Sequence, residues 1–300
     1  MKRGLVILTA LILMLLPLAG FASLAVDEDD DTHYELPVDF TPGQPLDQRF
    51  FSGELTYEDP TISVVITKDR LNGKVDYWLA DIEIKDPSQL RTMSWDGFDS
   101  TGVGDGEVMA RRANAVVAIA GDYFSWKGHD LIIRQGVTYL NRLRGNRDIL
   151  LIDEDGDFHG IEKADDGSVG THVNGKLIIN AFTFGPLLVN NGEIRRGGYN
   201  LAMSAEQKCQ RMAIAQTGHL KYRIICTGPH KRGSWGLTLE EFRTFVANMP
   251  DVIVAYNMDG GDSAKLMFGG VKINDVENPV NRDLADIIYF ASAYPGTPDQ

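Results

Sequence analysis

A polar loop between residues 257 and 263 carries the residue types of a binding or catalytic site. It reads Asn257-Met258-Asp259-Gly260-Gly261-Asp262-Ser263. An apolar, β-branched run at 252–256 precedes it and predicts a buried strand, so Asp259 would present a carboxylate at the strand end. Gly260 and Gly261 have no Cβ, so their amide groups can point at a ligand. This combination suits a phosphorylated or sugar substrate, although Asp-Gly is also a common pair in plain turns.

Two further residues could bring charge to such a site. A second apolar run, at 115–120, also ends in polar residues and places Asp122 at another strand end, unless Asp122 is simply a solvated turn residue. Arg211 begins an apolar run at 211–216, where an unpaired guanidinium would be costly. Arg211 therefore needs either a carboxylate in a structural ion pair or a bound anion such as a phosphate, and the sequence leaves both open.

The elements that would position these residues are mostly short strands. Apolar or alternating runs separated by Gly-rich turns predict strands. They lie at residues 62–67, 75–84, 115–120, 131–134, 148–153, 176–180, 187–189, 211–216, 220–227, 252–256, 266–268, 271–273 and 286–291. Helices are expected at 104–114 and at 238–248, where Thr238 and Glu241 have the spacing of a capping box. The sequence thus predicts an α+β fold: a strand-rich mixed sheet with a few helices, in a single domain of the catalytic type.

The N-terminal region indicates export. Lys2 and Arg3 precede an uncharged stretch that ends at residue 26. Residues 1–26 are therefore typical of a signal peptide, but they are also long enough for an N-terminal membrane anchor. The acidic, Pro-rich residues 27–54 have the composition of an exposed linker, and residues 55–295 would form the folded domain. We expect an extracytoplasmic protein, either secreted or anchored.

Composition excludes some classes of protein and site. The 300 residues carry a net charge of −13 at pH 7, which argues against nucleic acid or an acidic membrane surface as the main partner. Two cysteines are too few for a disulfide-dense scaffold. Zinc-type spacing of His and Cys is absent from the sequence, so a bound metal would be calcium or magnesium on oxygen ligands.

The two cysteines could face each other across a hairpin. If Thr217-Gly218 is a two-residue turn, Gln216 pairs with His219 and paired residue numbers sum to 435. Cys209 and Cys226 also sum to 435, so their side chains would be opposed and a disulfide would be feasible. The other outcome is a pair of small buried thiols.

Several segments, in this order along the chain, resemble the phosphodiester glycosidase family. They are residues 118–124, Ile133-Arg134-Gln135-Gly136, residues 184–189, 211–214 and 236–239, the loop from Asn257 to Ser263, and Arg282. The resemblance covers residues 57–290, and its most specific part is the Asp-Gly-Gly-x-Ser loop with an Arg downstream. The family includes enzymes that remove N-acetylglucosamine from a phosphodiester and many bacterial cell-surface proteins.

The resemblance implies an extracytoplasmic hydrolase of sugar-1-phosphodiester linkages, N-acetylglucosamine-like, in envelope or exopolysaccharide glycans. It assigns catalysis to Asp259, as nucleophile or base, and to Asp122, which would orient Asp259 or bind a cation. The substrate-binding residues that it implies are Arg134, Arg211, Asn257, Gly260, Gly261, Ser263 and Arg282. The partner would be a carbohydrate or phospho-glycan, and a calcium or magnesium ion could assist.

Three residues depart from the family's usual pattern. Ala120 stands where the family usually has Asn, so a side-chain amide is missing. Ala215 stands where a Gly is common. Asp262 occupies a position that is often Gly or a neutral amide, and its charge would repel a phosphate unless a cation offsets it. Ala120 and Asp262 favour an alternative function, a non-catalytic glycan-binding or envelope-assembly protein on the same fold.

Overall fold

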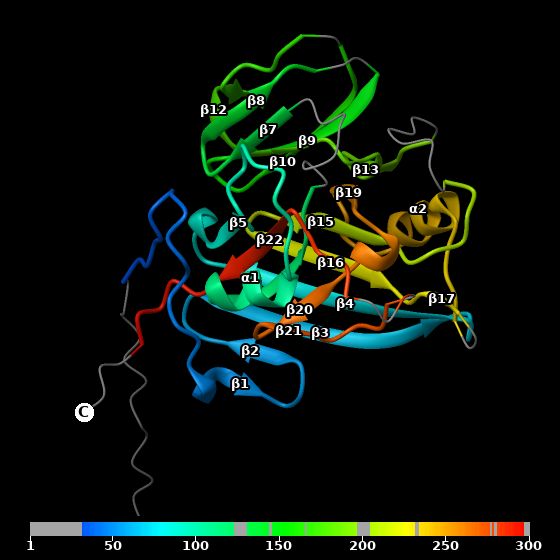
Figure 1. The fold of residues 1–300 in the computed structure, drawn as a ribbon, viewed down its shortest axis with the longest axis horizontal. Coiled ribbons are helices and arrows are strands. Elements are labelled where there is room, and N and C mark those ends of the chain that lie inside the picture. Colours follow the sequence, from blue (N-terminus) through cyan, green and yellow to red (C-terminus); the bar gives the residue numbers. More distant parts are fainter. Residues whose placement is uncertain are drawn as a thin grey trace, which may run out of the picture. The chain divides into compact units, whose positions relative to one another are not determined.

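The predicted apolar runs form strands, and these strands make three sheets. The computed structural model describes residues 32–122, 131–143, 146–165, 167–196, 205–231, 234–276, 278 and 281–296. The leader predicted at residues 1–26 lies outside them. The described chain from Tyr34 onward belongs to one unit of strands with two helices, α1 (Gly106–Arg112) and α2 (Leu239–Ala247) (Figure 1). The predicted strand-rich α+β class is confirmed.

The first sheet has nine strands that all run antiparallel to their neighbours. In spatial order they are β1 (Phe51–Ser52), β2 (Thr56–Glu58), β3 (Ile62–Leu71), β4 (Val75–Ile84), β16 (Lys221–Thr227), β15 (Met212–Gly218), β19 (Val254–Met258), β13 (Leu187–Asn190) and β14 (Glu193–Ile194). As predicted, β3 and β4 form a hairpin, and its turn places Asn72 and Gly73 at positive φ.

The second sheet has five strands and lies against the first. In spatial order they are β21 (Val271–Lys272), β20 (Leu266–Phe268), β6 (Ala115–Ala120), β22 (Asp286–Ala291) and β5 (Leu90–Ser94). These pairs are also antiparallel, so the described parts of both sheets are antiparallel rather than mixed. The β22 strand, late in the sequence, is inserted between β6 and β5.

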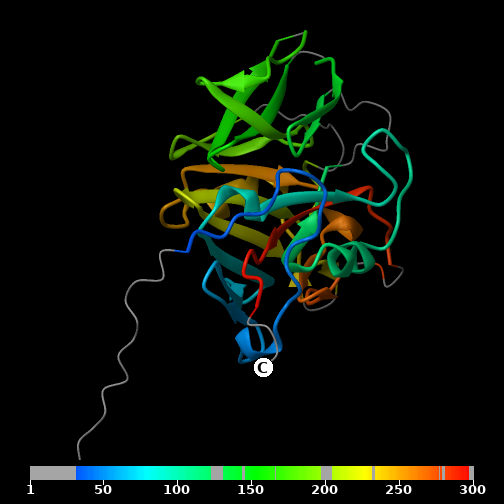
Figure 2. The same ribbon diagram turned by 90° about the vertical axis from the view of Figure 1, so that its left-hand side faces the viewer.

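A third sheet stacks on the other two, as two perpendicular views show (Figures 1 and 2). Its strands are β10 (Phe158–Ala164), β9 (Arg147–Asp153), β12 (Lys176–Phe182), β7 (Leu131–Arg134) and β8 (Val137–Asn141), with β11 (His172–Val173) paired to β12. The remaining elements are the strands β17 (His230–Lys231) and β18 (Ser234–Trp235) and the 3-10 turns η1 (Gln48–Phe50), η2 (Pro87–Gln89) and η3 (Gly261–Ser263).

Alternation along the strands divides the core between the faces of the sheets. On β15, Met212 and Ile214 enter the core between the first two sheets, whereas Ala213 and Ala215 face helix α2. Small side chains on that face let the helix pack close to the strand. On β6, the Ala-rich face packs in the same way against α1, which contributes Met109. Strands β15 and β6 are therefore buried on two sides.

Helix α2 and strand β19 fix the point where the Asp259 loop begins. The predicted capping box is present: the Thr238 hydroxyl accepts from the amide of Glu241, whose carboxylate accepts from the amide of Thr238. Strand β19 lies two residues later than predicted, because its pairing with β15 runs from Val254 to Met258. Asn257 is therefore a strand residue, and the loop starts at Asp259.

The hairpin of β15 and β16 turns two residues later than predicted. The turn falls at His219-Leu220, and Gln216 pairs with Tyr222 instead of His219. Leu220 adopts φ +56° and packs partly buried against the core, while its carbonyl accepts from the amide of Ile84. Leu220, which packs against the core, therefore occupies the turn, and Gly218 is the last paired residue of β15.

This register separates the two cysteines. Cys226 lies opposite Met212, and Cys209 forms its bridge with Leu237. Both are buried thiols, and no disulfide joins them. Burial raises the pKa of Cys226 to about 12.

The segment before residue 55 is part of the folded unit, not only a linker. Leu36 is buried, and the fully buried guanidinium of Arg91 donates to the carbonyls of Pro37, Asp39 and Thr41. The folded unit therefore begins about twenty residues earlier than the predicted boundary. From residue 32 on, the described chain contains no helix with the length and apolar character needed to cross a membrane.

We predict that a chain beginning at Leu36 folds like the full chain, whereas one beginning at Leu46 is less stable. The shorter chain lacks the three carbonyls that hold Arg91, and each hydrogen bond to a charged group contributes about 1.5–3 kcal/mol. Urea unfolding measures both free energies. Equal stability of the two chains would contradict the role given to this segment.

We also predict two thiols and no disulfide in the purified, unreduced protein. A thiol with a pKa near 12 is almost wholly protonated at pH 8, so Cys226 should react with a thiol reagent only after unfolding. Titration with the reagent before and after denaturation counts the thiols. Finding no thiols after aerobic denaturation would mean that the two cysteines are oxidised and that the register is different.

Candidate functional site

The Asp259 loop is held by the backbone of the neighbouring strand. A Cβ on Gly260 would come within 2.7 Å of the Gln210 carbonyl oxygen, so only glycine fits there. Gly261 has φ +56°, and its amide donates to the same carbonyl at 2.8 Å. The Gly261 amide is thus already bonded, which corrects the expectation that it faces a phosphate. The Gly260 amide instead bonds the Asp259 carboxylate.

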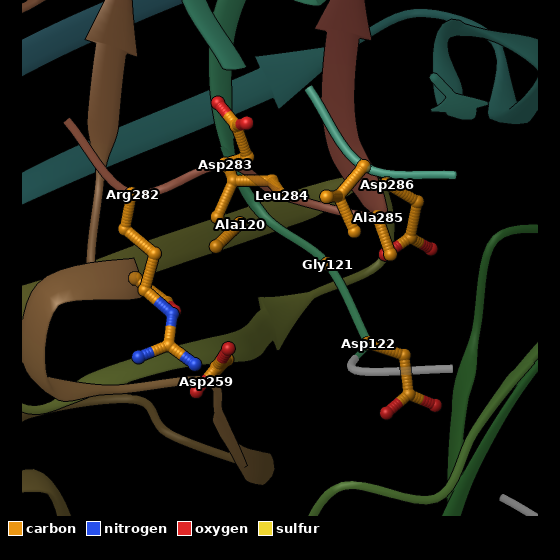
Figure 3. Close-up of a pocket in the computed structure, with 11 residues that line it drawn as sticks. Ala120, Gly121, Asp122, Asp259, Arg282, Asp283, Leu284, Ala285 and Asp286 are labelled. Atoms are coloured by element: carbon orange, nitrogen blue, oxygen red, sulfur yellow. The ribbon is translucent and has the colours of Figure 1, made fainter. Parts of the chain in front are cut away.

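Asp259 is half-buried, and burial disfavours the charged form of its carboxyl group. Burial raises its pKa to about 6, while the Ser263 hydroxyl and the charge of Arg282 act in the opposite direction. Arg282 extends its guanidinium toward the Asp259 carboxylate, and both residues line one small cavity (Figure 3). Asp259 therefore changes charge near neutral pH and has a cation beside it.

Asp122 lies on another wall of the same cavity. It follows β6, is 3% exposed, and accepts from the Thr183 amide at 2.8 Å. Its negative charge also raises the pKa of Asp259. The two strand-end carboxylates predicted from the sequence thus meet in one cavity, and Asp122 is not a solvated turn residue.

Arg134 is buried beside Asp122 and does not reach solvent. Its side chain is fully buried, 3.3 Å from Asp286 and 3.7 Å from Asp122, and its guanidinium carbon lies 4.2 Å from the centre of the Phe182 ring. It also donates to the Ala181 carbonyl. The expectation that Arg134 binds substrate is therefore corrected: within the described residues, its guanidinium holds two carboxylates and borders neither of the two cavities described here.

Asp286 is a site residue that sequence analysis missed. It is 1% exposed, and Gly121 must be glycine because a Cβ there would lie 2.4 Å from the Asp286 carboxylate. Burial raises the pKa of Asp286 to about 7, against the attraction of Arg134. A carboxylate at the start of an apolar strand was the available signal, whereas Asp122 was singled out because it follows the end of one.

A second, larger cavity adjoins the first. It encloses about 1260 Å³, including its open mouth, and shares Asp259, Ser263 and Arg282 with the first cavity. Its other lining residues include Arg211, Asn257, Asp262 and Phe184. The structure therefore brings together every predicted site residue except Arg134 around two connected cavities.

Arg211 and Asn257 lie in the wall of the larger cavity. The Arg211 guanidinium donates to the carbonyls of Leu237 and Gln207, and burial lowers its pKa. Asn257 is 5% exposed and donates through Nδ2 to the Gly185 carbonyl at 2.8 Å, while its Oδ1 has no hydrogen-bond partner in the described residues. A buried acceptor of this kind is costly unless a ligand supplies a donor.

Two of the residues that depart from the family's pattern also border the cavities. Ala120 is buried in the wall of the smaller cavity. Asp262 borders the larger cavity, and its Oδ1 accepts from the amide of Asn278 at 2.8 Å. Among the described residues, the carboxylates of the two cavities do not form a group of three close enough to share one metal ion.

Comparisons with known proteins identify the family and the fold of this chain. A family model described as phosphodiester glycosidase matches residues 113–291, more than half of the chain. The fold is similar to the zebrafish N-acetylglucosamine-1-phosphodiester alpha-N-acetylglucosaminidase catalytic domain, a structure described as auto-inhibited by its pro-peptide. The TM-score is 0.59 at 16% identity, over 78% of this chain and 84% of that one.

A hypothetical protein from Synechocystis is similar with a TM-score of 0.52 at 14% identity, over 79% of this chain and 64% of that one. No curated protein sequence matches the chain. These structural likenesses are too distant to show more than the fold. The family model, in contrast, spans Asp122, Arg211, Asp259, Arg282 and the strands that carry them. The chain therefore belongs to the phosphodiester glycosidase family.

Proposed function

We propose that this chain is an extracytoplasmic hydrolase that cleaves sugar-1-phosphodiester linkages, N-acetylglucosamine-like, in envelope or exopolysaccharide glycans. The observation that carries the proposal is the proximity of the Asp259 carboxylate and the Arg282 guanidinium where two cavities meet. A glycosyl phosphodiester needs both groups, because its sugar becomes positive and its phosphate negative as the bond breaks. The export part of the proposal rests on the leader at residues 1–26.

Asp259 is placed to act at the anomeric carbon. Cleavage of the bond between this carbon and the phosphate oxygen passes through an oxocarbenium-like state, which a carboxylate can stabilise or attack. Asp259 would be the nucleophile or the base that activates water. Asp122, fixed by the Thr183 amide, would orient the reacting groups or bind a calcium or magnesium ion.

The leaving phosphate requires charge neutralisation more than proton donation. Arg282 supplies a guanidinium beside Asp259, and Arg211 supplies a second one in the wall of the larger cavity. Asn257 Oδ1 would accept a hydrogen bond from a sugar hydroxyl or amide and so satisfy its buried acceptor. The sugar and its phosphodiester would thus lie across the junction of the two cavities.

One observation favours a second candidate, a non-catalytic glycan-binding or envelope-assembly protein on the same fold. Ala120 puts an apolar methyl group in the wall of the catalytic cavity, where the family usually has an amide. A protein without that hydrogen-bonding group could retain the sugar and phosphate contacts without turnover.

We predict that Asp259→Asn abolishes hydrolysis of an aryl or nucleotide-linked N-acetylglucosamine phosphodiester, with a loss of about 100-fold or more. Release of free sugar by purified protein is the measurement. Asp251→Asn is the matched control: it makes the same chemical change on an exposed residue before β19, and Asn tolerates its φ of +65°. Binding of the substrate without sugar release by the wild-type chain would support the second candidate instead.

We predict an acid limb in the pH profile of kcat/KM with a midpoint near 6. Asp259 must be ionised to attack or to accept a proton, and its pKa is raised to about 6, so activity should rise as pH increases through that value. Arg282→Gln removes a charge that lowers this pKa, so the midpoint should move upward. A profile that stays flat from pH 4.5 to 7.5 would exclude Asp259 as the ionising group.

A further inference from the structure

The Arg282 guanidinium lies beside Asp259, and contacts from another part of the chain hold the Arg282 backbone. Arg282 lies in an exposed segment, and a long exposed side chain loses conformational entropy when it is fixed in one place. Its backbone carbonyl, however, accepts a hydrogen bond from the ammonium of Lys265. The same ammonium donates to Asn281 Oδ1 at 2.6 Å. Two neighbouring residues of this segment are therefore tied to one lysine.

Lys265 is an unusual residue to find at this position. It is only 1% exposed, directly before β20, and burial lowers its pKa. Burying an ammonium is costly unless polar groups surround it. Here the acceptors come from Asn281 and Arg282, so Lys265 and the Arg282 segment stabilise each other.

Two more contacts strengthen this attachment. Asn281 Nδ2 donates to Asp105 Oδ2 at 2.7 Å, and Asp105 caps helix α1. Asp262 Oδ1 accepts from the amide of Asn278 at 2.8 Å, on the same side of the site. Lys265 follows Asp259 and Ser263 closely in the sequence, so its two hydrogen bonds join this part of the chain to Asn281 and Arg282.

We propose that Lys265 is a positioning residue that sets the Arg282 guanidinium against Asp259. Asp262 stands where the family usually has a neutral residue, and its carboxylate accepts a hydrogen bond from the amide of Asn278. The catalytic consequence rests on the proposed function, since it takes Arg282 as the group that binds the phosphate. The placement of Arg282 can be tested without any substrate.

The test measures the pKa of Asp259 by carbon-13 NMR of the side-chain carboxyl groups. The Asp259→Asn variant identifies which signal belongs to Asp259. An opposite charge close to a carboxyl lowers its pKa by about 1–3 units, so Arg282→Gln should raise the Asp259 midpoint from near 6 by about one unit. Lys265→Met, which keeps the length of the side chain, should raise it in the same direction because Arg282 would no longer be held in place.

A double variant separates positioning from direct charge. If Lys265 acts through Arg282, Lys265→Met should change nothing further in a chain that already carries Arg282→Gln. An equal rise in both backgrounds would show a direct effect of the lysine charge and overturn the proposal, as would the absence of any rise. Lys272→Met is the matched control, because it removes a nearby lysine charge from β21 without touching the Arg282 segment.

A neutral variant covers the case in which Lys265→Met fails to fold. Asn281→Ala changes an exposed residue, keeps every charge, and removes one of the two acceptors of Lys265 together with the link to Asp105. It should also raise the Asp259 midpoint, and an unchanged midpoint would overturn the proposal. In the activity assay, Lys265→Met should raise KM for the phosphodiester more than it lowers kcat. If the wild-type chain hydrolyses nothing, the proposed function fails but the NMR result still decides the role of Lys265.

Discussion

The buried guanidinium of Arg134 is the interaction on which the site depends. It comes from β7 of the third sheet and meets Asp286 at the start of β22 and Asp122 at the end of β6, both in the second sheet. A buried charge is tolerated only where opposite charges and hydrogen bonds surround it. Without this guanidinium, two buried carboxylates would lose the cation that they share.

The site divides its charges between an inner and an outer layer. Arg134, Asp122 and Asp286 form the inner layer, where surrounding protein atoms fix the geometry. Asp259 and Arg282 form the outer layer, which borders both cavities and can meet a substrate. Burial is the main cause of the raised pKa of Asp259, the negative charge of Asp122 adds to it, and the outer arginine acts against both. Ionisation near neutral pH is thus a property of the whole arrangement.

Much of this could be predicted from the sequence because strand ends leave a local signal. The runs that became β6 and β22 match the predicted ranges, and the polar residues beside β6 and after β19 correctly placed Asp122 and Asp259. The role of Arg134 could not be predicted, since its partners are 12 and 152 residues away and belong to another sheet. The turn at Leu220 was missed for a similar reason, because its position depends on packing against the core and on a bond to Ile84.

The place of β22 has a consequence for how the chain acquires its structure. This strand follows every other strand that the structure describes, yet it lies between β5 and β6, which both belong to the second fifth of the 300 residues. The second sheet cannot close until the chain has been made as far as residue 291, and pairing of such distant segments is intrinsically slow. Asp286 and Arg282 arrive with that final insertion, so the charged centre assembles last. Delayed folding of this kind is compatible with transport of the chain across a membrane before it folds.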